Sequence, residues 1–349
     1  MKELWTLSID LLFLDNGLMS EQIQNIIYQK PRKWSALVVG RAGLDLYPQP
    51  SGSKIKLAES FASDVGGSGG NIAIAMKRSG GNIALISALS DDPVGSFVKN
   101  RLIEEGIDIH LMQTTHGNER TSLAIAEERP TDCEVVIYRN NPADLQINFD
   151  KNTELAILDS SNLVVTGTSL IDEHSRKQVL NMMEHAKKND CKVWLDLDYR
   201  HWNWPDKSST RSAYQKAEKL SDVIVGNEEE FKILNDKLTI QVKQSMSNNQ
   251  IMILKKGKNG CTLFSRDSRL STGIYKLNVM KPFGSGDAFL GNLIMNYMTH
   301  GDWQKATEAG SAAAAIVVSK QGCASAMPSN QEIKLLQESK SIEPKTEWS

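Results

Sequence analysis

A glycine loop late in the chain contains the residue types that phosphoryl transfer requires. Gly284 and Gly286 flank Ser285, Asp287 follows at once, and an apolar, helix-like run begins at residue 289. The first backbone N–H groups of a helix lack intrahelical acceptors, and together with the helix dipole they form an anion site. A carboxylate beside such a site can take a proton from an attacking hydroxyl. Taken alone, the stretch favours a simpler interpretation of Asp287 as a helix N-cap, because Asp is common there.

A second glycine cluster, residues 66–70, precedes Asn71 and a predicted helix. A dinucleotide-binding turn would need a strand directly before it and an acidic residue about 20 residues on, at the end of the next strand. The preceding stretch, 61–65, is short and polar, but the next predicted strand does end in Asp91 and Asp92. A nicotinamide enzyme therefore stays open. The glycines could instead let a polyhydroxy ligand approach the backbone, with Asn71 supplying a donor and an acceptor.

The composition argues against several classes of partner. Lys and Arg number 40 against 42 Asp and Glu, a net charge of −2, so neither a nucleic-acid groove nor a polybasic membrane surface is predicted. No apolar run reaches the ~18 residues of a membrane span, and residues 4–14 lack the features of a signal peptide. The four cysteines are far apart without a C-x-x-C pair. They predict reduced thiols in a cytoplasmic protein rather than a zinc site or a disulfide framework.

Strand and helix patterns alternate along the chain, which predicts an α/β fold with a parallel sheet covered on both faces. Two further strands, 121–127 and 134–138, are predicted to pair antiparallel and to form a small separate sheet with residues 54–65. The predicted strands of the main sheet are 36–40, 82–89, 162–166, 192–197, 222–225, 251–254 and 261–264, and the predicted helices are 69–79, 94–105, 173–188, 209–220, 228–234 and two that start at Asp287 and Trp303.

Both ends of the chain differ from this pattern. Residues 1–33 are predicted to be an extension with a short helix at 20–28, packed on the core or on a partner chain. The tail, 331–349, is polar and charged, and its last residues are expected to be frayed.

The two glycine stretches resemble the two signatures of the ribokinase-like (PfkB) family of sugar kinases, and the likeness extends from about Leu37 to Pro328. It implies a ribokinase-like three-layer fold in residues 34–330, with a central, mostly parallel sheet flanked by helices. A small β-sheet lid would come from about 46–65 and 118–140. The resemblance also implies an enzyme that uses ATP and Mg²⁺. Such lids often pair across a dimer in this family, so we expect a homodimer.

Four further stretches, 40–47, 164–168, 195–200 and 322–328, are most similar to family members that phosphorylate 5-dehydro-2-deoxygluconate, an acid sugar of inositol breakdown. The chain also departs from the family pattern. Lys281-Pro282-Phe283 stands where Asp-Thr-Thr is frequent, and Ser285, Asn292 and Ser90 replace usual small residues. None of these changes removes the base. The change at Lys281 puts in doubt a cation loop that some members have near this position.

The resemblance assigns roles in catalysis and sugar binding. Asp287 would deprotonate the primary hydroxyl of the sugar, while Gly284, Ser285 and Gly286 would donate N–H groups to the transferred phosphoryl group. Asp45, interpreted as the end of the first strand, resembles the family's sugar-hydroxyl ligand, with a solvated turn acid as the alternative. The sugar site would be lined by Gly67, Gly69 and Asn71.

The resemblance also places nucleotide and metal residues. Asn227 and Glu230 match an Asn-x-x-Glu motif after a strand, and carboxylates with retained waters suit Mg²⁺. Acids are also common in the first turn of a helix without any metal. The turn that contains Lys256, Gly257 and Gly260 would meet the nucleotide phosphates and ribose, or would be a plain hairpin turn. Gly322 and Ala324 would border the adenine.

Two arginines are candidates for the carboxylate of an acid sugar, because Arg binds carboxylates in a bidentate manner. Arg139 ends a strand of the predicted lid, and a solvated face is its alternative. Arg200 follows the carboxyl end of a strand, where α/β proteins bind ligands.

The predicted function is ATP-dependent phosphorylation of the primary hydroxyl of an acid sugar. Three alternatives stay open. One is another kinase of the family, acting on 2-keto-3-deoxygluconate, fructose or ribose. The others are a catalytically silent sugar-binding regulator and an NAD-dependent oxidoreductase.

Overall fold

The computed structural model describes residues 32–235 and 250–348. Its contacts divide the chain into residues 1–33 and 34–349, and the second unit is described below. The helix predicted at 20–28 lies outside the described residues. In the part of the chain that is described, no helix is long and apolar enough to cross a bilayer.

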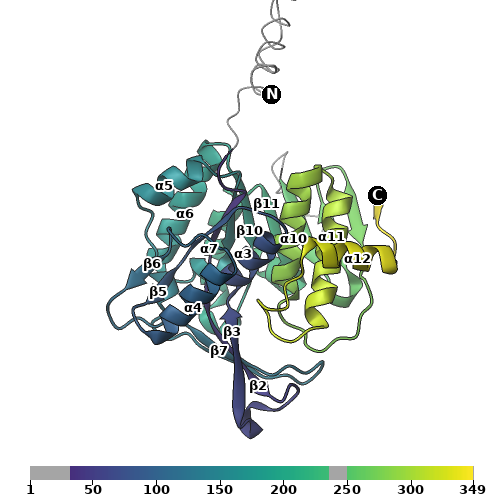
Figure 1. The fold of residues 1–349 in the computed structure, drawn as a ribbon. Helices are drawn as coiled ribbons and strands as arrows, with labels where there is room; N and C mark the ends of the chain where they lie inside the picture. The colour runs from purple at the N-terminus through teal and green to yellow at the C-terminus, as the bar shows by residue number, and fades with distance from the viewer. Residues whose placement is uncertain (1–31, 236–249, 349) are drawn as a thin grey trace, which may run out of the picture. The chain divides into compact units, whose positions relative to one another are not determined.

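A nine-stranded sheet forms the centre of this unit, in the order β15-β14-β13-β12-β11-β10-β9-β1-β4 (Figure 1). Its parallel strands are short and apolar, as expected for strands with both faces covered. The parallel strands are β1 (Ala36–Val39), β4 (Ile83–Ile86), β9 (Asn162–Thr166), β10 (Lys192–Asp196), β11 (Val223–Asn227) and β12 (Ile251–Lys255). β13 (Cys261–Phe264), β14 (Arg269–Thr272) and β15 (Glu347–Trp348) extend the sheet antiparallel.

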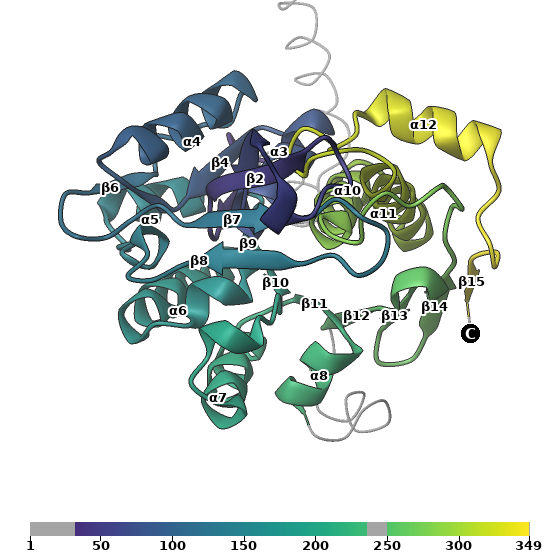
Figure 2. The same ribbon diagram turned by 90° about the horizontal axis from the view of Figure 1, so that it is seen from below.

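Helices cover both faces of this sheet because successive residues of a strand point to opposite sides. In β1, Ala36 and Val38 belong to one hydrophobic core, and Leu37 and Val39 to the other. The first core takes side chains from α3 (Ser68–Arg78), α4 (Pro93–Glu104), α10 (Ser285–His300), α11 (Trp303–Val318) and α12 (Asn330–Ser339). The second takes them from α5 (Lys151–Leu158), α6 (Glu173–Lys188), α7 (Lys207–Glu218) and α8 (Glu228–Leu234). Figure 2 shows α3, α10 and α11 on one side of the sheet and α6, α7 and α8 on the other.

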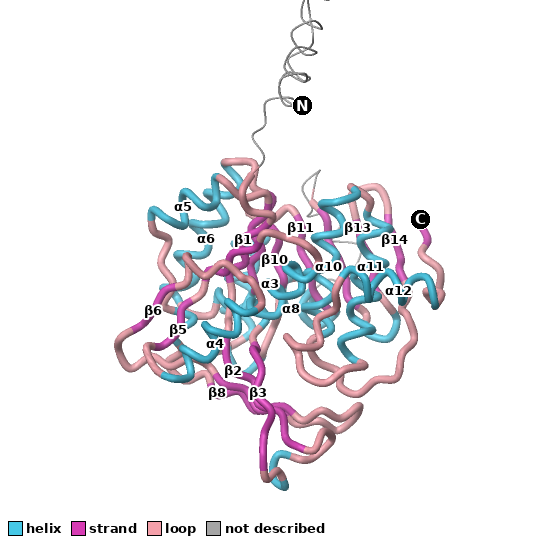
Figure 3. The backbone as a smooth tube through the Cα atoms, viewed as in Figure 1, coloured by secondary structure: helices cyan, strands magenta, loops and turns pink. Residues whose placement is uncertain are grey.

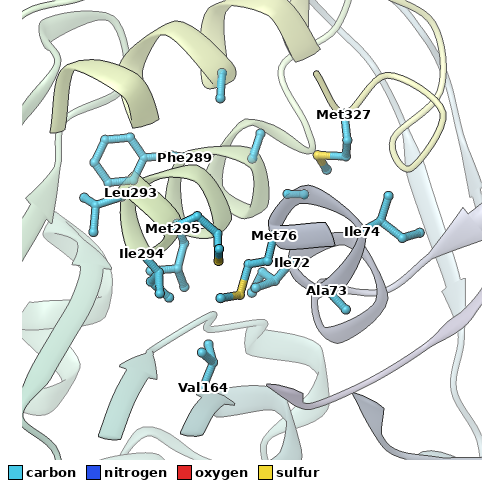
Figure 4. Close-up of a cluster of buried hydrophobic side chains, with 14 of the residues drawn as sticks. Ile72, Ala73, Ile74, Met76, Val164, Phe289, Leu293, Ile294, Met295 and Met327 are labelled. Atoms are coloured by element: carbon cyan, nitrogen blue, oxygen red, sulfur yellow. The ribbon is translucent and has the colours of Figure 1, made fainter. Parts of the chain in front are cut away.

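The helices α3 and α10, which open with the two glycine clusters, pack directly against each other. Apolar side chains of both helices, among them Ile72 and Met76 of α3 and Ile294 of α10, gather over β9 (Figure 4). Gly291 lets the backbones come close, since a Cβ there would lie 2.7 Å from the Cβ of Ala75. Asn292, where the family pattern has a small residue, is buried and accepts a hydrogen bond from Ser79 of α3 at 2.5 Å. The departure at Asn292 thus adds a polar contact between the helices.

A separate four-stranded sheet has the order β3-β2-β7-β8 and projects from one end of the unit (Figures 1 and 3). β7 (Leu123–Ala126) and β8 (Val135–Tyr138) pair antiparallel, as predicted. β2 (Gly43–Gln49) and β3 (Ser60–Gly66) complete this sheet. A short parallel pair, β5 (Ala88–Ser90) and β6 (Gln113–Thr115), lies elsewhere in the unit.

One prediction about the small sheet was wrong. Asp45 does not end the first strand: β1 ends at Val39, and Asp45 lies within β2. Residues 54–65 contribute β3 to the small sheet, as predicted, and a 3-10 helix, Ile55–Leu57, precedes that strand. The backbone N–H of Ile55 donates to the carboxylate of Glu127 at 2.8 Å instead of to a neighbouring strand.

The prediction of a frayed tail was also wrong. The tail contains α12 and then β15, which pairs with β14 at the edge of the main sheet. Ile274 and Glu343 form an antiparallel bridge just before it. An edge strand offers unpaired backbone groups, and here the polar tail occupies them.

Candidate active site

The two glycine stretches meet through one hydrogen bond. Asn71, in the first turn of α3, donates from Nδ2 to Oδ2 of Asp287, in the first turn of α10, at 2.8 Å. Gly284 caps α10 with φ +80°, and a side chain there would also crowd Cys323, so the turn requires glycine. The N–H groups of Ser285 and Gly286 lie in the first helical turn, where no intrahelical acceptor exists. A hydrogen-bonded carboxylate therefore lies beside a set of anion-binding amides, which is the arrangement predicted from the sequence.

The pKa of Asp287 is raised from 3.8 to about 7. Burial is the largest cause, and the nearby carboxylate of Asp198 adds to it, while the hydrogen bond from Asn71 opposes it. Asp196 raises the pKa further and Arg200 lowers it. A base with a pKa near neutrality can hold a proton during transfer and still be ionised at the start of the reaction.

The carboxyl ends of three neighbouring parallel strands bring polar side chains to one edge of the main sheet. Asp196 ends β10, Asn227 ends β11 and Lys255 ends β12, with Asn227 and Lys255 paired in register. The ammonium of Lys255 lies 2.9 Å from Oδ1 of Asp196. A Cβ added to Gly286 would lie 3.4 Å from the same ammonium. Lys255 therefore presents a cation to the glycine loop from the sheet side.

Burial would lower the pKa of Lys255, but the carboxylate of Asp196, followed by those of Glu230 and Asp198, holds it above its usual range. The lysine thus stays charged. From the sequence we predicted Lys256 as the nucleotide-binding lysine of this turn, and we assigned no separate role to Lys255, Asp196 or Asp198. The side chain of Lys256 donates to the Thr262 hydroxyl at 2.6 Å, along the hairpin. The rule that ligands bind at the carboxyl ends of parallel strands would have favoured Lys255.

Arg200 lies in the same group of charges. Its guanidinium contacts Oδ1 of Asp198 at 2.8 Å while 45% of its side chain stays exposed. Asp198 is the main reason that the pKa of Arg200 is raised, and Asp287 contributes to it. Arg200 therefore lies near the carboxylate of Asp287 and retains exposed N–H donors, as a ligand for an anionic substrate requires.

The predicted sugar side of the site, at Asp45 and Asn71, contains two buried acceptors without partners among the described residues. Tyr47 donates to Oδ2 of Asp45 at 3.1 Å, but Oδ1 of Asp45 and Oδ1 of Asn71 have no hydrogen bond. Burial raises the pKa of Asp45 to about 6. Because an unsatisfied buried acceptor costs free energy, these two oxygens favour a ligand with hydroxyl donors.

Gly67 and Gly69 allow the start of α3 to pack closely on the backbone that follows β1. Gly69 packs on the backbone of Gly40, and a Cβ at Gly69 would lie 2.6 Å from the Gly40 carbonyl carbon. Gly67 similarly faces the carbonyl of Arg41. The strand before this cluster, β3, belongs to the small sheet. The cluster therefore lacks the context of a dinucleotide turn, in which a strand of the main parallel sheet leads directly into the helix.

Arg139 already has protein partners in the structure. It forms an ion pair with Asp144, both side chains being almost fully buried, and donates to the carbonyl of Thr168 at 3.0 Å. This pairing favours a structural role for Arg139 over its predicted role as a ligand of the substrate carboxylate.

Asn227 and Glu230 form a capping box at the start of α8. Both carboxylate oxygens of Glu230 accept backbone N–H groups, from Asn227 at 2.6 Å and from Tyr199 at 3.0 Å. Within residues 32–235 and 250–348, no three His, Cys, Asp or Glu side chains form a cluster that could hold a metal ion. Each carboxylate oxygen of Glu230 already has a backbone donor.

The remaining predicted nucleotide residues lie in two turns. Gly257 and Gly260 form the turn between β12 and β13, both with positive φ. Gly322 donates its N–H to Glu128 at 2.5 Å, and the nearby Ala324 is buried. The loop that contains Gly322 is thus bound to the segment that follows β7 of the small sheet.

Comparisons with known proteins agree with this geometry. Residues 34–330 match the family described as pfkB family carbohydrate kinase. The chain is similar to the 5-dehydro-2-deoxygluconokinase of Photobacterium profundum, with 37% identity over 316 residues that cover 88% of this chain and 95% of the relative. The enzyme of the same name from Clostridium tetani is 32% identical over 320 residues, which cover 88% of this chain and 94% of the relative.

The fold is similar to that of a fructokinase from Xylella fastidiosa solved with bound ATP. The TM-score is 0.78 at 22% identity, and the match covers 87% of this chain and 98% of that chain. This likeness confirms the predicted fold class, a mostly parallel sheet flanked by helices with a small additional sheet.

We predict that Asp287→Asn stabilises the protein at pH 8. The folded pKa of about 7 lies above the unfolded value of 3.8, so the ionised carboxylate opposes folding above pH 7, and this cost fades as the pH falls towards 4. We expect a gain of roughly 1–3 kcal/mol in the free energy of unfolding at pH 8, and a smaller gain at pH 5, both measured by urea unfolding.

The matched control is Asp267→Asn, at an exposed position in the turn after β13. This control should change stability by less than about 0.5 kcal/mol at either pH. A loss of stability in Asp287→Asn at pH 8 would contradict the electrostatic account of the site.

Proposed function

The chain belongs to the pfkB family of carbohydrate kinases, and from this premise we propose that it transfers the γ-phosphoryl group of ATP to the primary hydroxyl of 5-dehydro-2-deoxygluconate. The observation that carries the proposal is the hydrogen bond from Asn71 to Asp287. It places one carboxylate between the amides of the glycine loop and the unpartnered acceptors on the sugar side. The names of the curated relatives support the choice of sugar.

In the proposed mechanism, the primary hydroxyl of the sugar donates a hydrogen bond to Asp287. Its proton moves to the carboxylate as the hydroxyl oxygen forms a bond to the γ-phosphorus of ATP, and the bond from that phosphorus to the bridging oxygen of ADP breaks. The N–H groups of the loop Gly284–Gly286 and the ammonium of Lys255 stabilise the negative charge on the transferred group. No covalent intermediate with the protein is needed.

Mg²⁺ would neutralise charge on the nucleotide phosphates when it is bound. The carboxylates of Glu230 and Asp196 suit this ion through retained water molecules, because Mg²⁺ keeps several waters and binds few protein groups directly. The turn that contains Lys256, Gly257 and Gly260 lies next to Lys255 and would contact the nucleotide.

We assign recognition of the acid group to Arg200. An arginine binds a carboxylate through two parallel N–H donors, and Arg200 is partly exposed beside Asp198.

The small sheet carries Asp45 on β2. We propose that this sheet acts as a lid that excludes water from the site. Apolar side chains on this sheet, including Phe61, Val136 and Tyr138, are exposed, which supports a homodimer formed through the lid. The four free thiols support a cytoplasmic location.

The first prediction concerns the base. Asp287→Asn should lower kcat by about 10²- to 10⁴-fold, because the amide cannot accept the hydroxyl proton, while ADP binding measured by calorimetry changes little. Undiminished turnover in this variant would exclude the mechanism. Sugar binding without turnover in the wild-type protein would instead favour the silent regulator.

The second prediction concerns Lys255. Lys255→Met should lower kcat/KM for ATP by roughly 10- to 100-fold, because a charge-assisted contact with a phosphate oxygen is lost. The control is Lys216→Met, at an exposed position on α7 away from the proposed nucleotide turn, which should stay within about twofold of wild type. Equal losses in the two variants, measured by steady-state kinetics, would remove Lys255 from the site.

The third prediction concerns the substrate. A panel of 5-dehydro-2-deoxygluconate, 2-keto-3-deoxygluconate, fructose and ribose, assayed by coupled ADP detection, should show the highest kcat/KM for 5-dehydro-2-deoxygluconate. Arg200→Gln should reduce kcat/KM by roughly 10- to 100-fold for the acid sugars, with a smaller change for the neutral sugars.

Arg101→Gln is the control for Arg200, since Arg101 lies on α4, where it pairs with Glu104 at the surface and lies over the ring of Phe97. It should leave the substrate preference unchanged. A panel without preference for an acid sugar would contradict the choice of substrate but not the kinase activity.

A further inference from the structure

Lys281 is a buried charge that the proposed mechanism does not use. Its side chain has no exposed surface, which is rare for a lysine. The ammonium donates to the carbonyl of Val317 at 2.9 Å and to the carbonyl of Phe283 at 3.3 Å. It also lies 5.1 Å from the centre of the Phe283 ring. The three partners of the ammonium named here, all among the described residues, are two carbonyls and a ring, and none is a carboxylate.

The two carbonyls belong to the ends of different helices. Val317 lies in the last turn of α11, whose final carbonyls lack intrahelical donors and carry partial negative charge. Phe283 directly precedes Gly284, the N-cap of α10. The backbone N–H groups of Met280 and Lys281 bond to the carbonyl of Val318 at 2.7 and 3.3 Å. Lys281 thus ties the start of the glycine loop to the C-terminus of α11.

The environment of this ammonium is that of a bound cation. Two backbone carbonyl oxygens and an aromatic face attract a cation without neutralising it. Burial lowers the pKa of Lys281, while the thiol of Cys323 and the carboxylates of Glu128, Asp64 and Asp287 counteract that effect. The ammonium therefore lies between the C-terminal end of α11 and the residue that directly precedes the glycine loop.

Phe283, whose ring lies beside the ammonium of Lys281, is also linked to the proposed sugar side of the site. The ring of Phe283 stacks on that of Tyr47, with centroids 6.1 Å apart and an interplanar angle of 4°. Tyr47 in turn donates to Asp45 at 3.1 Å. A change in the position of Phe283 would therefore reach both the glycine loop and the acceptor on the sugar side.

We propose that Lys281 is a tethered cation that holds the glycine loop in its anion-binding shape, so that the enzyme needs no free monovalent cation for this purpose. The proposal rests on the proposed kinase function. Lys281 is a positioning residue here, because its ammonium contacts the carbonyl before the loop and not the transferred group.

The test uses the full-length protein in a tetramethylammonium buffer with Mg²⁺. Wild-type kcat should change by less than twofold when K⁺, Na⁺ or NH₄⁺ is added at 100 mM. Lys281→Met, which keeps the length of the side chain without its charge, should lower kcat by about 10-fold or more while KM for the sugar changes by less than about threefold. The control is Lys320→Met, just after α11, where the lysine pairs with Glu332 at the surface; it should behave as wild type.

Lys281→Ala supplies a readout that does not depend on activity. It leaves a space lined by the same two carbonyls, so NH₄⁺ or K⁺ should raise its melting temperature and restore part of its kcat, whereas tetramethylammonium is too large to do so. The wild-type melting temperature should not respond to the choice of cation.

The inference would be overturned by wild-type kcat in folded Lys281→Met, or by a requirement of the wild-type enzyme for K⁺. A cation-independent melting temperature in Lys281→Ala would also overturn it. Failure of the kinase proposal can be told apart from failure of this inference. If the protein is not a kinase, the wild type turns over no sugar, but the melting temperature of Lys281→Ala still depends on the cation.

Discussion

The site depends on holding one carboxylate where the protein is built to attract anions. Asp287 lies among the first amides of α10, and Asp198 and Asp196 are close enough to raise its pKa further. Such crowding of negative charge opposes folding. The amide of Asn71 and the guanidinium of Arg200 offset part of this cost for Asp287, and Lys255 pairs with Asp196. The result is a base with a pKa near neutrality beside a loop that can accept a phosphoryl group.

The packing of α3 against α10 makes this arrangement possible. Gly291 permits close contact between the helices, and the bond between Ser79 and Asn292 fixes their relative position. Because the helices start on the same side of the sheet, Asn71 and Asp287 come within hydrogen-bonding distance. The apolar core beneath them therefore determines the geometry of the polar contact between the two glycine stretches.

The small sheet is joined to the nucleotide side of the site by carboxylates. Asp64, on β3, accepts hydrogen bonds from the backbone N–H and the hydroxyl of Ser325, and Glu128 accepts the N–H of Gly322. Tyr47 on β2 contacts Asp45 and stacks on Phe283, just before the glycine loop. The small sheet is thereby connected both to the loop that contains Gly322 and to the residue that precedes the glycine loop.

The sequence by itself determined the alternation of strands and helices, the two glycine clusters and the place of Asp287 at the start of a helix, because these depend on local periodicity and on motifs of a few adjacent residues. It misplaced Asp45 and the tail, since pairing with a distant strand decides both. Only the tertiary structure showed that Arg139 is paired with Asp144, that Glu230 closes a capping box and that Lys255 rather than Lys256 faces the glycine loop. The contact of Lys255 with the glycine loop joins residues far apart in the chain, whereas Arg139 and Glu230 meet partners three to five residues away, and the fold decides which way each side chain turns. A charged residue has the same identity whether it is already paired or open to a ligand, and folding alone decides between the two.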